Sequence, residues 1–219
     1  MNCFEIVDHY ANEFAKTLKL RDSLPIAIEE YPWKNRLWSS AMKYRRAHVE
    51  EFSTPTIKVL HVTVFPHLSD PAPIFGFDVV TGAKKPAGCY FDLSPSLHSW
   101  KWRHILDPMN LELPKEKTIP DWGTCFSDEF IAVAPQDEKQ LEDLLVSGLY
   151  LLRVYLQRLH VMRENRKDVA KHQRFYCEQQ RSNQKTRQIL ERMIGAERTE
   201  KFMTEVLFPD PPKPVFGSP

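Results

Sequence analysis

The spacing of hydrophobic residues predicts one helix at the start of the chain and a set of strands after it. Over residues 3–20, apolar residues recur every three or four positions, which is the spacing of one face of an amphipathic helix. Pro25 and Pro32 then interrupt regular structure. From Tyr44 the period changes to two, which is typical of strands. The predicted strands cover residues 44–52, 57–65, 74–80, 89–93 and 130–133, and their short connections favour an antiparallel meander.

Helical periodicity returns after Pro135 and predicts a long helix over residues 137–159. A polar segment, residues 163–188, precedes two shorter predicted helices, 187–194 and 197–207, which Gly195 separates as a C-cap. The layout of helix, strands and helices predicts an α+β fold with helices covering an antiparallel sheet. We expect a single domain over residues 1–208 and a proline-rich tail over 209–219.

Composition and charge narrow the possible functions. The 219 residues include 30 Lys and Arg against 29 Asp and Glu, a net charge of +1 that argues against a general nucleic-acid binder. No apolar run approaches the roughly 20 residues of a membrane span, and the first residues lack the features of a signal peptide. We therefore expect a cytoplasmic protein that does not bind a membrane. The cysteines have no metal-binding spacing and are expected to be reduced thiols: Cys3, Cys89, Cys125 and Cys177.

Polar side chains on strands that otherwise look buried are the strongest chemical signal. The motifs GxGxxG, GxxxxGK[ST], GxSxG and HExxH are absent. His48 and Glu50, two residues apart on one strand, share a face. His61 and Asp78 each lie between apolar neighbours on the next two strands. These residues either line the wet face of a sheet, or form a buried His–carboxyl pair that shares a proton and suits general acid–base catalysis.

Several collinear segments resemble the ferredoxin-dependent bilin reductases: YRRAHVEEF, VLHVTVFPH, PIFGFDVVTG, DLSP, IPDWG and YCEQQRSNQKTRQILERMIG. The resemblance covers residues 44–208 and is greatest to the branch that forms phycocyanobilin and to a phage-associated relative that forms phycoerythrobilin. It implies a three-layer α/β/α sandwich with a central antiparallel sheet flanked by helices, and a biliverdin pocket between the sheet and the C-terminal helices. It also implies that no cofactor or metal is bound and that electrons come from reduced ferredoxin with a [2Fe–2S] cluster.

The resemblance assigns the catalytic residues. Asp78 matches the family's aspartate that donates a proton to the bilin, and His61 matches a histidine that hydrogen-bonds the lactam oxygen. Glu50 matches, with a one-residue gap before His61, a glutamate used to reduce the D-ring exovinyl group.

The resemblance also assigns the substrate-binding residues. Lys185 and Lys117 match groups that meet the propionates, while His48 matches a pocket histidine. Gln184 departs from the family, which usually has an aspartate there that in several members helps to reduce the A-ring. The remaining predicted binding residues are Gln180 and Asn183.

These matches predict a monomeric reductase of biliverdin IXα that adds four electrons in two steps of two. Because the departure from the phycocyanobilin branch at Gln184 falls in the pocket, we expect the product to be phycoerythrobilin, formed through 15,16-dihydrobiliverdin. Glu50 favours the alternative product, phycocyanobilin. A non-catalytic bilin carrier or lyase on the same fold is the rival from another functional class, since it would not need Asp78.

Overall fold

The computed structural model describes residues 1–114, 116, 123–160 and 166–212. Its centre is a seven-stranded antiparallel sheet in which each strand pairs with the next along the chain, so the predicted meander is confirmed. The strands are β1 (Ser23–Pro25), β2 (Lys34–Ser40), β3 (Tyr44–Ser53), β4 (Lys58–Pro66), β5 (Ile74–Thr81), β6 (Pro86–Ser94) and β7 (Ile131–Val133).

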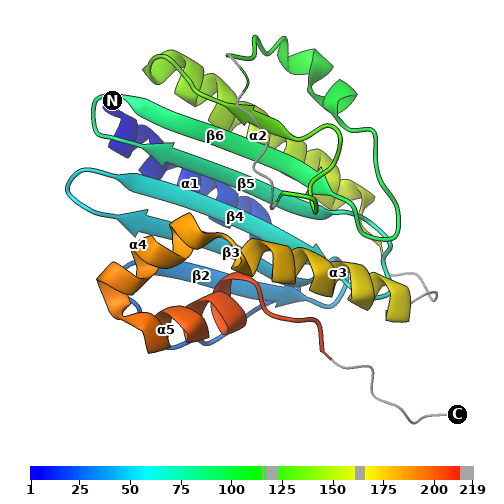
Figure 1. Cartoon of the computed structure of the whole chain (residues 1–219). Coiled ribbons are helices and arrows are strands. Elements are labelled where there is room, and N and C mark those ends of the chain that lie inside the picture. Colours follow the sequence, from blue (N-terminus) through cyan, green and yellow to red (C-terminus); the bar gives the residue numbers. More distant parts are fainter. Residues whose placement is uncertain (115, 117–122, 161–165, 213–219) are drawn as a thin grey trace, which may run out of the picture.

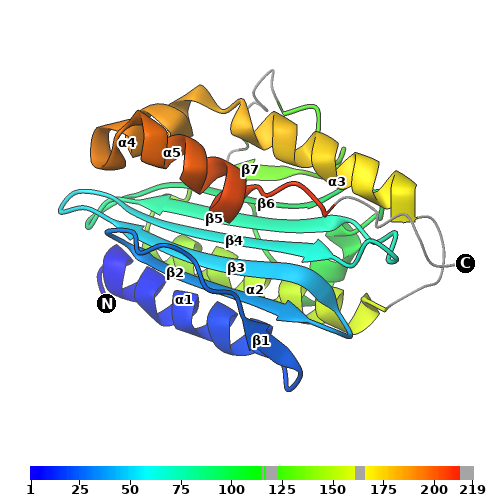
Figure 2. The same ribbon diagram turned by 90° about the horizontal axis from the view of Figure 1, so that it is seen from below.

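Helices cover both faces of the sheet, which confirms the three-layer α+β sandwich (Figures 1 and 2). One face carries α1 (Cys3–Leu18) and α2 (Glu138–Arg158). The other carries α3 (Arg166–Arg181), α4 (Gln184–Ile194), α5 (Ala196–Lys201) and a π-helix (Phe202–Leu207). A short 3₁₀ helix spans Arg103–Met109. Within the described part of the chain, no helix is both long and apolar enough to cross a membrane.

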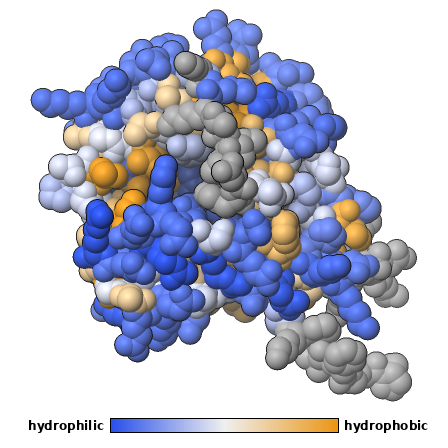
Figure 3. Space-filling model, viewed as in Figure 1, coloured by the Kyte–Doolittle hydropathy of each residue, from blue (hydrophilic) through white to orange (hydrophobic). Residues whose placement is uncertain are grey.

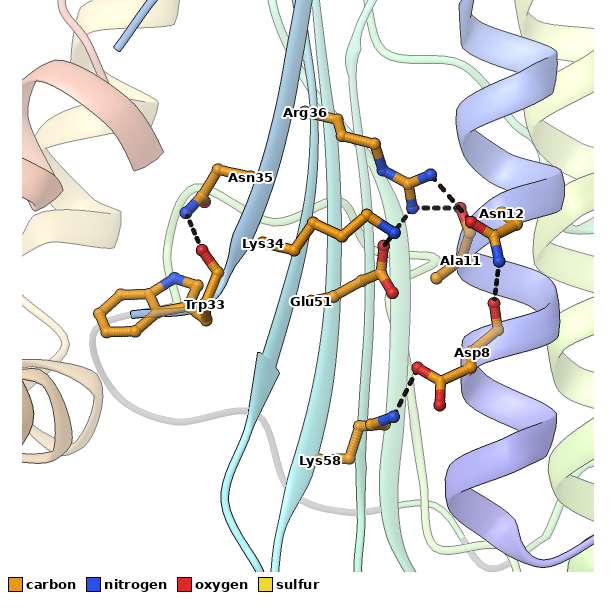
Figure 4. Close-up of polar contacts among 9 residues, drawn as sticks. All are labelled: Asp8, Ala11, Asn12, Trp33, Lys34, Asn35, Arg36, Glu51 and Lys58. Atoms are coloured by element: carbon orange, nitrogen blue, oxygen red, sulfur yellow. Dashed lines mark hydrogen bonds and ion pairs between the residues drawn. The ribbon is translucent and has the colours of Figure 1, made fainter. Parts of the chain in front are cut away.

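Strands β1 and β2 were not predicted, because the prolines and charged residues around them hide the alternation. Pro25 is tolerated because β1 is an edge strand, where a missing N–H breaks no ladder. In β2 the charged side chains face α1 (Figure 4). Arg36 donates to Asn12 Oδ1 and to the Ala11 carbonyl, each at 3.0 Å, and also pairs with Glu51.

The helices after α2 also differ from the prediction. Helix α3 occupies most of the polar segment. It was not predicted because its buried residues are few and some, such as Gln173, are polar. Helix α4 begins three residues earlier than predicted, at Gln184, because the Asn183 side chain caps it by accepting from the N–H groups of Lys185 and Thr186. Gly195, at a φ of 79°, ends α4 as predicted.

The two faces of the central strands differ in polarity. Towards α1 and α2, the central strands present mainly apolar side chains to the larger core, among them Val49, Val62, Phe77 and Phe91. The charged Glu51 and Lys58 lie on the same face, where they pair with side chains of β2 and α1. Towards α3 and the π-helix, the same strands present His48, Glu50, His61, Thr63, Asp78 and Asp92. Strand alternation therefore concentrates the polar groups beneath the C-terminal helices.

Candidate active site

The strand register brings the three predicted catalytic residues into one row. Glu50 on β3 is paired with His61 on β4, and His61 is paired with Asp78 on β5. Directly paired residues on antiparallel strands have Cβ atoms roughly 5 Å apart and lie on the same face. His48 lies two residues from Glu50, and its ring centroid is 5.9 Å from that of His61.

His61 and Asp78 form a close pair. Nδ1 of His61 is 2.6 Å from Oδ1 of Asp78. The His61 side chain is only 9% exposed, whereas that of Asp78 is 39% exposed, so the carboxylate remains accessible from outside the sheet. Nε2 of His61 is hydrogen-bonded to the hydroxyl of Thr63, which is fully buried. Both ring nitrogens are therefore engaged, an arrangement that suits a doubly protonated imidazolium.

Burial and charge set the protonation states of this row. Burial alone would lower the pKa of His61, but attraction to Asp78, the hydrogen bond to it and the charge of Glu50 raise that pKa above its ordinary value. Burial raises the pKa of Glu50 to about 7; His61 opposes that shift and Asp78 adds to it. Burial, helped by the charge of His61, holds the pKa of His48 well below its ordinary value. The row thus contains a carboxyl that can hold a proton near neutral pH beside a histidine that favours its charged form.

Two buried polar atoms beside the row have no hydrogen-bond partner, which is rare in folded proteins. One is Nδ1 of His48, whose Nε2 donates to Asn35 Oδ1 at 3.0 Å, so the free nitrogen of the neutral ring is an acceptor. The other is the indole N–H of Trp33, a donor whose interaction with Glu50 lowers the pKa of that carboxyl. The space-filling view of this side shows a hollow bordered by hydrophobic side chains (Figure 3). Among the described residues, no group of three or more His, Cys, Asp and Glu side chains is arranged to hold a metal ion.

Comparison with known families shows which family the chain belongs to. A family model described as ferredoxin-dependent bilin reductase matches residues 15–209. The chain belongs to the ferredoxin-dependent bilin reductase family. The protein is therefore an enzyme, and its electrons come from ferredoxin, as the resemblance implied.

The relatives of this bilin reductase include proteins named phycocyanobilin:ferredoxin oxidoreductase. The one from Trichodesmium erythraeum is 31% identical over 188 residues, which cover 81% of this chain and 76% of the relative. The one from Prochlorococcus marinus is 27% identical over 215 residues, covering 91% and 89%.

Two solved structures share the fold. The structure of PcyX has a TM-score of 0.64 at 21% identity and covers 92% of this chain and 97% of its own. Tomato phytochromobilin synthase, solved in complex with biliverdin, has a TM-score of 0.69 at 16% identity, with 93% and 82% covered. At these identities the likeness establishes the three-layer architecture.

The other predicted binding residues lie at the junction of α3 and α4, apart from the strand row. Gln180 is buried at the end of α3, while Lys185 is exposed on the first turn of α4. Asn183 is committed to capping α4, and the exposed Gln184 donates to the Ser182 carbonyl at 3.4 Å. Lys117 lies outside the described residues.

The residues that hold the row in place were not predicted from the sequence. Asn35 fixes one nitrogen of His48, Thr63 fixes one of His61, and the Phe208 ring lies 5.8 Å from the ring of His61. Thr63 carried a usable signal, since it is two residues from His61 and shares its face. Nothing in the sequence pattern pointed to Asn35 or Phe208, because β2 was not predicted and Phe208 comes from a distant part of the chain.

Proposed function

We propose that this bilin reductase converts biliverdin IXα to phycoerythrobilin through 15,16-dihydrobiliverdin, with Asp78 and His61 as the proton centre. The single observation that supports this most strongly is the 2.6 Å contact between His61 and the accessible Asp78, on the sheet face beneath the C-terminal helices. An enzyme that receives single electrons must supply one proton for each electron that the substrate keeps. A paired histidine and carboxyl within reach of the substrate serve that purpose.

The reaction balances as the uptake of four electrons and four protons by biliverdin, in two steps of two. Reduced ferredoxin supplies the electrons singly, so the bilin passes through radical states while no other redox group takes part. Asp78 delivers a proton to the bilin and His61 hydrogen-bonds a lactam oxygen. The unpartnered Nδ1 of His48 accepts a hydrogen bond from an N–H group of the tetrapyrrole.

The binding residues complete the proposal. Lys185 meets a propionate at the exposed start of α4, and Lys117 meets the second one; Gln180 and Asn183 border the same end of the substrate. Lysine ammonium groups suit carboxylates because charge-assisted hydrogen bonds are stronger than neutral ones. The enzyme acts as a cytoplasmic monomer.

The identity of the product rests on two residues. Gln184 replaces a carboxyl that the family usually has, which favours phycoerythrobilin. Glu50 favours the second candidate, phycocyanobilin, because it is a buried acid with a pKa of about 7 paired with His61. Anaerobic incubation with biliverdin IXα and reduced ferredoxin, followed by HPLC of the released pigment, distinguishes them. Elution with phycocyanobilin would replace the proposed product, and an unchanged spectrum of bound biliverdin would overturn the assigned substrate.

Asp78→Asn tests the proton centre separately. This variant keeps the size of the side chain but cannot donate a carboxyl proton, so we expect biliverdin binding within about threefold and turnover reduced at least about 100-fold. Stopped-flow spectra under anaerobic conditions should show an intermediate that forms and stalls. Full turnover by this variant would remove Asp78 from its role.

A further inference from the structure

The segment that follows the π-helix is held against the sheet by arginines. Phe208, Pro209 and Asp210 continue from the end of the π-helix and cross the sheet beside α3, as the red trace shows (Figures 1 and 2). Arg46 donates to the carbonyls of Glu205 and Val206, each at 2.9 Å. Arg45 donates to the Pro209 carbonyl at 3.3 Å, and Arg181 donates to the Phe208 carbonyl at 3.0 Å. We call these three side chains the arginine clamp.

Two members of the clamp sit in an unusual environment. Burial lowers the pKa of Arg45 and of Arg46 to about 10 each, so both remain charged at neutral pH. Among the described residues, neither forms an ion pair with a carboxylate. Burying an arginine costs free energy unless its N–H groups are hydrogen-bonded. Backbone carbonyls of one short segment fill part of that need, and the Gln173 side chain accepts the Nε–H of Arg45 at 2.6 Å. The buried Nε–H of Arg46 has no hydrogen-bond partner.

The clamp determines where the Phe208 ring lies. This ring is 5% exposed and stands nearly perpendicular to the imidazole of His61, with centroids 5.8 Å apart and planes at 83°. Tyr176 of α3 contacts Phe208 in a similar edge arrangement at 6.4 Å. Phe208 therefore closes one side of the imidazole, while Asp78 and Thr63 bind its two nitrogens.

We infer that Phe208 is a positioning residue for the reaction: held by the arginine clamp, it fixes the plane of the His61 ring against Asp78 and keeps water from that side. The inference rests on the proposed function, because positioning His61 matters for the rate only if the His61–Asp78 pair supplies protons. The segment that follows the π-helix thus contributes to the active site as well as to the core.

The titratable groups around His61 set its pKa, so the pKa of His61 can report on the role of Phe208. Asp78 on β5 and Glu50 and His48 on β3 face the imidazole, and the charge of Asp78 also acts on Tyr176 of α3. Opening the Phe208 side to water screens these charges and relaxes the contact with Asp78. Hydration moves a perturbed pKa towards its value in water, so the raised pKa of His61 should fall.

The experiment compares Phe208→Leu with Phe202→Leu, the same substitution within the same apolar cluster. Phe202 is fully buried but contacts Tyr31 and Trp33, and no ring contact joins it to His61. The first readout is the NMR titration of His61 in the ligand-free enzyme. We expect Phe208→Leu to lower its apparent pKa by about half a unit or more, and Phe202→Leu to leave it unchanged.

The second readout is turnover of biliverdin across pH. We expect Phe208→Leu to lower kcat about tenfold with KM within about threefold, and the pH–rate profile to shift together with the His61 titration. Arg181→Gln, which frees the Phe208 carbonyl without removing the ring, should shift both in the same direction by less. This variant also keeps the test open if Phe208→Leu is poorly folded.

The outcomes separate the inference from the proposed function. If the wild type does not convert biliverdin, the proposed function fails, while the ligand-free titration still reports whether Phe208 controls His61. If Phe208→Leu and Phe202→Leu lose activity only in proportion to their folded fraction, and the His61 titration and pH profile match the wild type, Phe208 is merely structural and the inference is overturned.

Discussion

Glu50 is an acid buried opposite a histidine, and its burial makes the stability of the protein depend on pH. Burial raises its pKa from the ordinary 4.5 to about 7, so the folded state holds this proton more tightly than the unfolded state. The resulting stability is present below about pH 4.5 and is lost as pH rises through about 7. Glu50→Gln cannot ionise, so its unfolding free energy should not include this loss. The difference in unfolding free energy between Glu50→Gln and the wild type should therefore be about 2 kcal/mol more favourable to the variant at pH 8 than at pH 5. Urea denaturation at the two pH values measures this; equal differences would show that Glu50 titrates normally.

The same titration predicts how the rate depends on pH. In the route to phycocyanobilin, the second candidate function, the protonated form of Glu50 is the proposed donor, and this form becomes scarce as pH rises above about 7. We expect kcat of the wild type to fall between pH 7 and 9, and Glu50→Gln to lose that part of the profile along with most of its activity. If kcat of Glu50→Gln still falls between pH 7 and 9, another group controls that part of the profile and the prediction is wrong.

Thr63 gives a prediction that separates hydrogen bonding from packing. Its hydroxyl is bonded to Nε2 of His61 and is buried. Thr63→Val keeps the shape but leaves the imidazolium N–H unpaired, which costs about 1–3 kcal/mol. We expect turnover to fall about tenfold and the His61 titration to move to lower pH, whereas Thr63→Ser should retain both. Similar behaviour of the Val and Ser variants would count against this role.

At the scale of elements, the packing of α2 on β5 depends on one residue without a side chain. A Cβ on Gly148 would lie 2.2 Å from Cε2 of Phe77, the residue before Asp78. Alanine is ordinarily better than glycine inside a helix by about 1 kcal/mol. Here the collision should reverse the sign, so that Gly148→Ala lowers the unfolding free energy by about 1–3 kcal/mol. Thermal melts compare it with Gln157→Ala on the exposed side of α2; a raised melting temperature for Gly148→Ala would mean that the helix shifts freely.

Elements were predictable from sequence where one periodicity held without interruption. The patterns for α1, α2 and β3 to β6 matched the structure because each has a continuous apolar stripe facing the larger core. Strand β2 was not predicted because Lys34 and Arg36 occupy the positions that an alternation would make apolar; both pair with Glu51 of the neighbouring strand. Tertiary ion pairing of this kind leaves no trace in a hydrophobicity pattern.

At the scale of the whole molecule, the sequence could predict which residues form the site, but not how they are arranged in space. Alternation placed His48 and Glu50 on one face, and the resemblance singled out His61 and Asp78. Their alignment in one row depends on the register of two hairpins, including an irregularity between Tyr44 and Arg46. Phe208 reaches His61 only after the chain has crossed the sheet and returned, so its place required the complete fold.

The two outermost strands, β1 and β7, bear on how the molecule behaves in a crowded solution. Each has three residues; β1 ends in Pro25, and on the other side Glu116 bridges Val133. A sheet edge recruits another chain through a row of unpaired N–H and C=O groups, and short edges with proline offer few of them. Neither edge of the sheet therefore favours pairing with a strand of another copy. This matters because the net charge is only +1, so electrostatic repulsion between copies is weak. Light scattering after gel filtration should give a mass near 25.7 kDa at high concentration, and a dimer there would mean that copies join through another surface.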